Sequence, residues 1–371
     1  MSEAIVSSIP LARFGLWEKI GNKGVLSAFE MEVTARCNNN CVHCYINLPA
    51  GDRGAKEKEI SFHEIKEIVD EAVSLGALWC LITGGEPLLR EDFSQIYLYL
   101  KKKGILISVF TNATLITEDH VRLFKRYPPR NIEVSVYGVT EETYERVTRT
   151  PGSFAAFIRG LDLLMENGIK VRLKAMIMRS NVHESPEIIH FCREKTKDYF
   201  RFDPFIHLRY DGDPVRNEQI KAERLSPREI VSLERSDPDR FEVLKKVCEN
   251  LITQKIINST DNLLFRCGAG EYSFTLSYDG LFRLCSSLWH PDAVYDLRKR
   301  SLTEAWQKFV PQVRNLCSNR RQFLETCKGC HLINLCMWCP ALAHLETGDL
   351  DMPVDYFCHV AHAREEALIH A

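Results

Sequence analysis

Short apolar segments rich in β-forming residues alternate with segments of helical period from about Phe29 to Asp211. Such alternation requires βα crossovers and produces a parallel sheet that is buried on both faces. Six units predict an α/β fold with a partial (β/α)6 TIM-type barrel, because a complete eight-unit barrel needs roughly 250 residues. The predicted strands are 28–33, 78–83, 105–110, 132–136, 171–176 and 202–208. The predicted helices include 62–75, 92–102, 118–127, 154–166 and 187–195.

The barrel pattern stops after residue 211, and this sets the predicted domain boundaries. The next segment is charged and contains Ser226-Pro227-Arg228-Glu229, a capping box with proline at the first helical position, so it predicts a helical bridge. From about Leu263 onward cysteines are dense and regular structure is sparse, as expected where metal clusters replace a core. We therefore predict an N-terminal extension (1–26), the barrel (27–211), the bridge (212–261) and a cysteine-rich domain (262–371).

Charge and hydrophobic patterning narrow the class of protein. The formal net charge of the 371 residues is −2, so no overall field points to nucleic acid. Because the chain shows neither a signal-peptide pattern nor an apolar run of about 18 residues, we expect no membrane span and a cytoplasmic location. Fourteen cysteines without an export signal do not read as a disulfide framework, since the cytosol keeps thiols reduced. They are metal ligands, catalytic thiols or small buried side chains.

Three cysteines follow the first predicted strand at close spacing, as Cys37-x3-Cys41-x2-Cys44. Three thiolates on one short loop can hold three irons of a 4Fe–4S cube and leave the fourth iron open. The asparagines at 38–40 suit a loop that wraps a cluster, because Asn tolerates left-handed backbone and makes local hydrogen bonds. The alternatives are a zinc loop or thiols that share a loop by chance.

This loop resembles the signature of the radical S-adenosylmethionine (SAM) superfamily. The resemblance implies that the open iron chelates the amino and carboxylate groups of SAM. One electron from the cluster then cleaves SAM and yields a 5′-deoxyadenosyl radical, which abstracts hydrogen from a substrate. The position before the third cysteine is usually aromatic in this family and lies beside the adenine, and His43 fits it.

A second motif, Thr83-Gly84-Gly85-Glu86-Pro87, follows the second predicted strand. Glycines allow a close backbone approach, and a carboxylate accepts hydrogen bonds from an ammonium group. The motif resembles the family's Gly-Gly-Glu, which binds the SAM amino group. A Gly-Gly-Glu of this kind is otherwise an ordinary turn.

Further residues at strand ends resemble family positions that line the SAM pocket. They are Thr111 and Asn112 after the third strand and Ser135 in the fourth, with Ser135 near the methionine carboxylate. Relatives often carry Asp where this chain has Tyr137, which leaves the polar network beyond Ser135 open. Lys174, in the fifth strand, either pairs with the SAM carboxylate or extends to solvent.

The C-terminal cysteines form a longer series. It comprises Cys267, Cys285, Cys327, Cys330, Cys336, Cys339 and Cys358. A zinc ribbon is one interpretation, although seven ligands exceed one tetrahedral site and fall one short of two. The order resembles the SPASM domain of many radical SAM enzymes, which holds two auxiliary 4Fe–4S clusters and so implies three clusters in all. Relatives usually have three residues in the last gap, where this chain has Met337-Trp338.

The resemblance divides these cysteines into two ligand sets. Cys267, Cys285 and Cys339 would hold the first auxiliary cluster, and Cys327, Cys330, Cys336 and Cys358 the second. The first set lacks one ligand, so its fourth iron binds a substrate thiolate, water, a carboxylate such as Glu271, or Cys317. Cys80 and Cys192 lie in apolar segments and are expected to be packed thiols, and Cys248 matches no motif.

The family resemblance implies a maturase that modifies a ribosomally made peptide by a crosslink, a thioether or a side-chain oxidation. Fewer than thirty residues precede the first strand, so we expect a separate protein to present a peptide leader, and a flavodoxin or ferredoxin to donate electrons. One alternative is the same chemistry on a small molecule such as a tetrapyrrole. Another is a non-catalytic iron–sulfur electron-transfer protein or zinc-stabilised binding module.

A candidate substrate site lies at the end of the sixth predicted strand. Strand alternation would place His207, Arg209 and Asp211 on one face, toward the substrate. A surface cluster of ion pairs is the alternative.

Overall fold

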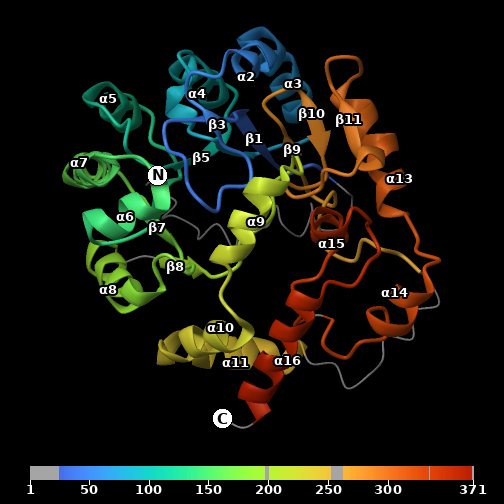
Figure 1. Ribbon diagram of the computed structural model, residues 1–371. Coiled ribbons are helices and arrows are strands. Elements are labelled where there is room, and N and C mark those ends of the chain that lie inside the picture. The colour runs from blue at the N-terminus through green and yellow to red at the C-terminus, as the bar shows by residue number, and fades with distance from the viewer. Residues whose placement is uncertain (1–24, 197–199, 252–261, 334, 370–371) are drawn as a thin grey trace, which may run out of the picture.

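A nine-stranded sheet organises the computed structural model, which describes residues 25–196, 200–251, 262–333 and 335–369 (Figure 1). Six parallel strands form the partial barrel, as predicted. They are β1 (Ala28–Thr34), β4 (Trp79–Gly84), β5 (Leu106–Thr111), β6 (Asn131–Val136), β7 (Val171–Met176) and β8 (Phe200–Asp203). A two-stranded ladder beside β1 joins β2 (Arg36–Cys37) to β3 (Leu48–Pro49).

Helices follow the strands and cover the outside of the barrel (Figure 1). They are α2 (Arg53–Lys58), α3 (Phe62–Ser74), α4 (Phe93–Lys102), α5 (Glu118–Arg126), α6 (Glu141–Thr148), α7 (Ser153–Glu166) and α8 (Ser185–Lys195). Short 3-10 turns are η2 (Pro87–Leu89), η3 (Val182–Glu184) and η4 (Pro291–Ala293). The helix α3 begins at a capping box in which Ser61 and Glu64 bond each other's backbone N–H. It buries Ile65, Ile68, Val69 and Ala72 against the sheet, so helical spacing directs one apolar stripe into the core.

The bridge predicted for 212–261 is helical where the structure describes it. It contains α9 (Pro214–Glu223), α10 (Pro227–Arg235) and α11 (Pro238–Leu251). The capping box predicted at Ser226 and Glu229 is present and opens α10. The predicted N-terminal extension lies almost wholly outside the described residues.

The C-terminal region continues the barrel sheet. Its strands are β9 (Ser273–Leu276), β10 (Leu281–Arg283) and β11 (Val294–Asp296). Because β9 pairs in parallel with β1, the first barrel strand lies between β4 and β9. The helices that follow are α12 (Leu302–Glu304), the π-helix η5 (Ala305–Phe309), α13 (Val310–Arg314), α14 (Arg321–Thr326), α15 (Pro340–Thr347) and α16 (Asp355–Ile369). No helix in the described residues is long and apolar enough to cross a bilayer.

The sixth strand differs from its predicted range. The structure ends β8 at Asp203, whereas the sequence pattern predicted a strand over 202–208. Pro204 follows, and proline has no N–H to donate to a ladder. The Asp203 carboxylate then accepts a hydrogen bond from the backbone N–H of Phe205 at 3.0 Å and turns the chain. The expectation that strand alternation orients residues 207–211 is therefore wrong.

Candidate functional site

A cavity of about 310 Å³ opens at the carboxyl ends of the barrel strands. Barrel enzymes place their chemistry at this end, because the loops that follow the strands converge there. Most of the residues predicted for the cluster and the SAM pocket line it. These are Cys37, Cys41, His43, Cys44, Gly84, Gly85, Thr111, Asn112, Ser135 and Lys174, together with His207 from the predicted substrate site. Glu86, Arg209 and Asp211 do not line it.

The three loop cysteines lie close enough to interact electrostatically. Cys37 and Cys41 are 9% and 6% exposed. Burial raises the pKa of Cys41 well above its ordinary value, and the thiols of Cys44 and Cys37 raise it further. The Cys37 sulfur accepts contacts from the backbone N–H of Asn39 at 3.4 Å and from the Asn112 amide at 3.8 Å. Since metal binding requires thiolates, cations at this loop would displace protons that burial holds in place.

Unpartnered polar atoms beside the loop also fit a bound group. Both side-chain polar atoms of Asn39 and the Nδ1 atom of His43 are buried without a hydrogen-bond partner. Buried polar groups in a finished site are normally bonded, so these atoms fit the addition of a ligand. In the described residues, no three Cys, His, Asp or Glu side chains converge as they would on a single ion. In a cluster, by contrast, each thiolate binds a different iron, which spaces the ligands further apart.

The Gly84-Gly85 pair lets β4 end against the backbone of β1. A Cβ atom on Gly84 would overlap the carbonyl oxygen of Thr34, and one on Gly85 would overlap that of Arg36. The φ angle of Gly84 is +131°, which disfavours a larger residue in any case. The Gly85 N–H donates to the Thr34 carbonyl at 2.7 Å, and this fixes the turn beside the cysteine loop.

Glu86 ties two strand ends together. Its carboxylate accepts hydrogen bonds from the Thr111 hydroxyl at 2.8 Å, the Asn112 N–H at 2.8 Å and the Leu88 N–H at 3.1 Å. The side chain is fully buried, and burial raises its pKa to about 7. Glu86 therefore positions Thr111 and Asn112 at the cavity wall, and its predicted contact with the SAM amino group remains a prediction.

His43 and Ser135 each contact Tyr137. The rings of His43 and Tyr137 have centroids 5.2 Å apart, and Tyr137 itself lines the cavity. Burial, together with the nearby cations of Lys174 and Arg216, lowers the pKa of His43 to about 3, so the imidazole is neutral at pH 7. Ser135 lies within hydrogen-bonding reach of Tyr137. The Tyr137 side chain thus contacts both His43 and Ser135 at the cavity wall.

The predicted substrate site divides into two parts. His207 reaches the cavity, and its Nδ1 lies 3.4 Å from the Ser287 hydroxyl. Arg209 and Asp211 instead pair with each other at 2.6 Å, and Arg209 is 4% exposed. The physical reason is the turn after Asp203, which ends the strand before the alternation can act. The prediction that these three side chains share one face is therefore wrong.

Several cavity residues have no counterpart in the predicted site. Glu30, Asp203, Ser286 and Ser287 line the cavity. Glu30 could have been predicted as a site residue, because it places a carboxylate within the apolar first strand and buried charges are rare. No local sequence signal marks Ser286 and Ser287, because they reach the cavity only through the pairing of β9 with β1.

The C-terminal cysteines fall into two electrostatic groups. Burial, together with the neighbouring thiols of Cys285 and Cys267, raises the pKa of Cys339 to about 12. Burial, together with Cys358, Cys327 and Cys330, likewise raises the pKa of Cys336 to about 11. These neighbours match the two ligand sets that the family resemblance implies, and the cluster assignment itself stays a prediction.

The remaining cysteines and Glu271 have other surroundings. Cys80 and Cys192 are 1% and 0% exposed, which confirms that they are packed thiols. Cys317 is exposed, and its thiol donates to the Asn315 carbonyl at 3.4 Å. Glu271 pairs with Arg314 at 2.8 Å. The side chain of Cys248 lies outside the described residues.

Comparison with known proteins bears directly on this site. The family model of the radical SAM superfamily matches residues 31–192. An Fe-coproporphyrin III synthase of Methanosarcina barkeri is 26% identical over 330 residues, which are 82% of this chain and 80% of the relative. The antilisterial bacteriocin subtilosin biosynthesis protein AlbA of Bacillus subtilis is 26% identical over 331 residues, 83% of this chain and 70% of the relative.

A solved structure extends the likeness to the fold. SuiB of Streptococcus suis, bound to its precursor peptide SuiA, superposes with a TM-score of 0.69 at 17% identity, over 93% of this chain and 78% of SuiB. The partial barrel and the cysteine-rich C-terminal region both agree with this likeness, and the family model matches residues within the barrel. The chain contains a radical SAM domain at residues 31–192 and is an enzyme of that class.

Proposed function

We propose that this radical SAM enzyme carries three 4Fe–4S clusters and oxidatively modifies a peptide. The observation that supports the cluster count is the division of ten cysteines into one barrel loop and two C-terminal groups, each coupled through its thiols. Cys37, Cys41 and Cys44 would hold the cluster that binds SAM. When bound, that cluster supplies the electron that cleaves SAM to a 5′-deoxyadenosyl radical, which takes hydrogen from the substrate.

The protein side chains would position SAM between the loop and the strand ends. The neutral imidazole of His43 offers a face for the adenine, and Ser135 and Lys174 lie on the cavity wall for the carboxylate. Cys285 immediately precedes Ser286 and Ser287, which line the same cavity. A group bound at Cys285 would therefore lie beside the cavity, where it could accept an electron from a substrate radical.

The charge of the cavity favours a peptide side chain as substrate. Its charged lining consists of two carboxylates, Glu30 and Asp203, and one ammonium group, Lys174. Burial lowers the pKa of His207, so this imidazole adds no positive charge at pH 7. A tetrapyrrole with several carboxylates would meet repulsion here, because binding a polyanion requires matching cations. A neutral or cationic side chain of a peptide would not be repelled by the carboxylates of the cavity.

Similarity to the Fe-coproporphyrin III synthase supports the alternative of a tetrapyrrole substrate. The deciding experiment is anaerobic incubation of the reconstituted enzyme with SAM and either dithionite or a reduced flavodoxin. Candidate peptides, with and without a leader-presenting protein, are compared with coproporphyrin III and its iron complex. We expect 5′-deoxyadenosine in every reaction and a mass change in a peptide. Turnover of a porphyrin alone would establish the alternative, and no 5′-deoxyadenosine at all would contradict both.

A further inference from the structure

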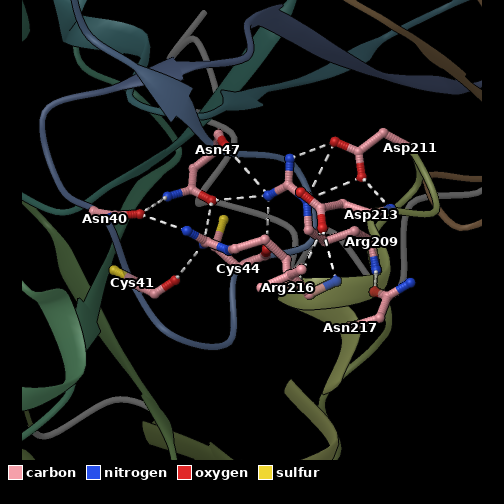
Figure 2. Close-up of polar contacts among 10 residues, drawn as sticks. Asn40, Cys41, Cys44, Asn47, Arg209, Asp211, Asp213, Arg216 and Asn217 are labelled. Carbon is pink, nitrogen blue, oxygen red and sulfur yellow. Dashed lines mark hydrogen bonds and ion pairs between the residues drawn. The ribbon is translucent and has the colours of Figure 1, made fainter. Parts of the chain in front are cut away.

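Arg209 holds the cluster loop, defined here as residues 37–47, from outside the cavity (Figure 2). Its Nη1 atom donates to the carbonyl oxygens of Cys44 at 3.3 Å and Asn47 at 3.2 Å. The same guanidinium pairs with Asp211, whose carboxylate accepts from Nε and Nη2. The charge of Arg209 is thus compensated within the protein.

Arg216, in the first turn of α9, donates hydrogen bonds to a second part of the same loop (Figure 2). Its Nη2 atom donates to the Cys41 carbonyl at 3.1 Å and to Asn47 Oδ1 at 3.2 Å. Its Nη1 atom donates to Asn40 Oδ1 at 2.7 Å. The side chain therefore bonds the loop on both sides of Cys41 without lining the cavity.

The two arginines differ in their charge balance. All three acceptors of Arg216 are neutral amide or carbonyl oxygens. The nearest carboxylate in its own segment, Asp213, accepts from the backbone N–H groups of Val215 and Arg216 as a helix cap. Burial lowers the pKa of Arg216, and the cations of Arg209 and Arg149 lower it further, whereas Cys44 and Asp213 raise it. Among the described residues, no carboxylate accepts a hydrogen bond from this half-buried guanidinium, and the loop thiolates would place negative charge beside it.

We propose that Arg216 is a positioning residue that supplies the counter-charge of the SAM cluster and sets its reduction potential. This inference rests on the proposed ligation by Cys37, Cys41 and Cys44. Hydrogen bonding and nearby charge are the means by which proteins tune such clusters. When an external reductant delivers one electron, the loop gains one negative charge. A fixed cation bonded to that loop stabilises the added charge, and so makes reduction easier.

The test compares Arg216→Gln with Arg216→Lys in the full holoenzyme. Electron paramagnetic resonance during a redox titration gives the midpoint potential of the cluster whose signal changes on addition of SAM. We expect Arg216→Gln to move this midpoint to a more negative potential, with roughly tenfold less reduced cluster at a fixed solution potential. Arg216→Lys keeps the charge and should retain most of the wild-type potential.

Lys221→Gln is the matched control, because it removes one positive charge from the same helix where Lys221 pairs with Glu218 on the surface. It should leave the potential unchanged. An Arg216→Gln midpoint equal to that of the wild type, or one reproduced by Lys221→Gln, would overturn the proposal. A loss in Arg216→Lys as large as in Arg216→Gln would also overturn the role of charge.

Two further measurements separate this proposal from the proposed ligation. Iron content shows whether Arg216→Gln keeps its clusters, and hydrogen exchange of the apoprotein shows whether residues 37–47 lose protection. If Ala at all three loop cysteines leaves the iron content at the wild-type level, the ligation fails first. If that variant loses its iron but Arg216→Gln behaves as the wild type in every readout, only the counter-charge role fails.

Discussion

The barrel cysteines and the C-terminal cysteines differ in how deeply they are buried. Cys37 and Cys41 are buried, whereas Cys267 and Cys358 are exposed. Beside the second C-terminal group lies a small separate apolar cluster, whose buried members are Leu332, Leu335 and Ala361 and against which Cys330 and Cys336 pack. The barrel loop is therefore shaped by protein packing before any metal arrives. The segment around Cys330 and Cys336, beside the small cluster, would depend more on bound metal for its structure.

The largest effect is expected when the three cysteines of the barrel loop are replaced and the C-terminal cysteines are left intact. Replacing Cys37, Cys41 and Cys44 by Ala should remove about four irons and abolish 5′-deoxyadenosine formation, because no other group of the chain is proposed to present SAM to a cluster. Iron analysis and chromatography of the reaction measure both. The C-terminal absorbance should persist. Continued SAM cleavage by the variant would show that the loop is not the catalytic ligand set.

The next variant changes the C-terminal cysteines and leaves the barrel loop intact. Cys327→Ala combined with Cys330→Ala should also lose about four irons, but with a different consequence. Limited proteolysis should cut residues 327–336 faster than in the wild type, since the apolar cluster beside them is small. Fragments of the barrel should stay intact, and SAM cleavage without substrate should continue. Equal protease resistance in both cysteine variants would remove the proposed contrast between the two regions.

Glu86→Gln tests the carboxylate that links β4 to β5. An amide cannot accept the Thr111 and Asn112 hydrogen bonds in the same geometry, and bonds to charged groups contribute about 1.5–3 kcal/mol. We expect roughly tenfold weaker SAM binding with cluster content unchanged, measured by calorimetry on the oxidised enzyme. Glu67→Gln, an exposed position on α3, is the control. An unchanged SAM affinity would limit Glu86 to a structural role.

The smallest effect is expected for the packed thiols. Cys80→Ala and Cys192→Ala should each lower the free energy of unfolding by about 1 kcal/mol, because each leaves a small cavity in the core. Iron content and SAM cleavage should equal those of the wild type. Denaturant unfolding monitored by circular dichroism provides the measurement. A loss of iron in either variant would mean that a packed thiol takes part in ligation.

Local patterns predict much of this molecule. The six barrel strands, five of the helices and both predicted capping boxes follow from hydrophobic period and cap residues, which act within a few positions. The helix α6 has no counterpart among the predicted helices, because it is short and largely polar. The cysteine loop and Gly84-Gly85 were identifiable because each motif is contiguous.

Contacts between distant segments account for what the sequence could not predict. Arg216 acts on the carbonyl of a residue 175 positions away, so no local pattern identifies it. The pairing of β9 with β1 is equally remote, and it brings Ser286 and Ser287 to the cavity. The strand predicted after Phe202 fails at Pro204, where a single residue overrides the apolar run.

The position of β1 between β4 and β9 also has a consequence for biosynthesis. A hydrogen bond from Ser27 to Tyr272 joins residues 245 positions apart. A ribosome adding about 5–20 residues each second needs roughly 12–50 s to cover that distance. During this interval the first strand lacks one neighbour, and the cysteine loop that follows it has an incomplete wall. A cluster bound at the loop would therefore gain the wall that contains Ser286 and Ser287 only after β9 has docked.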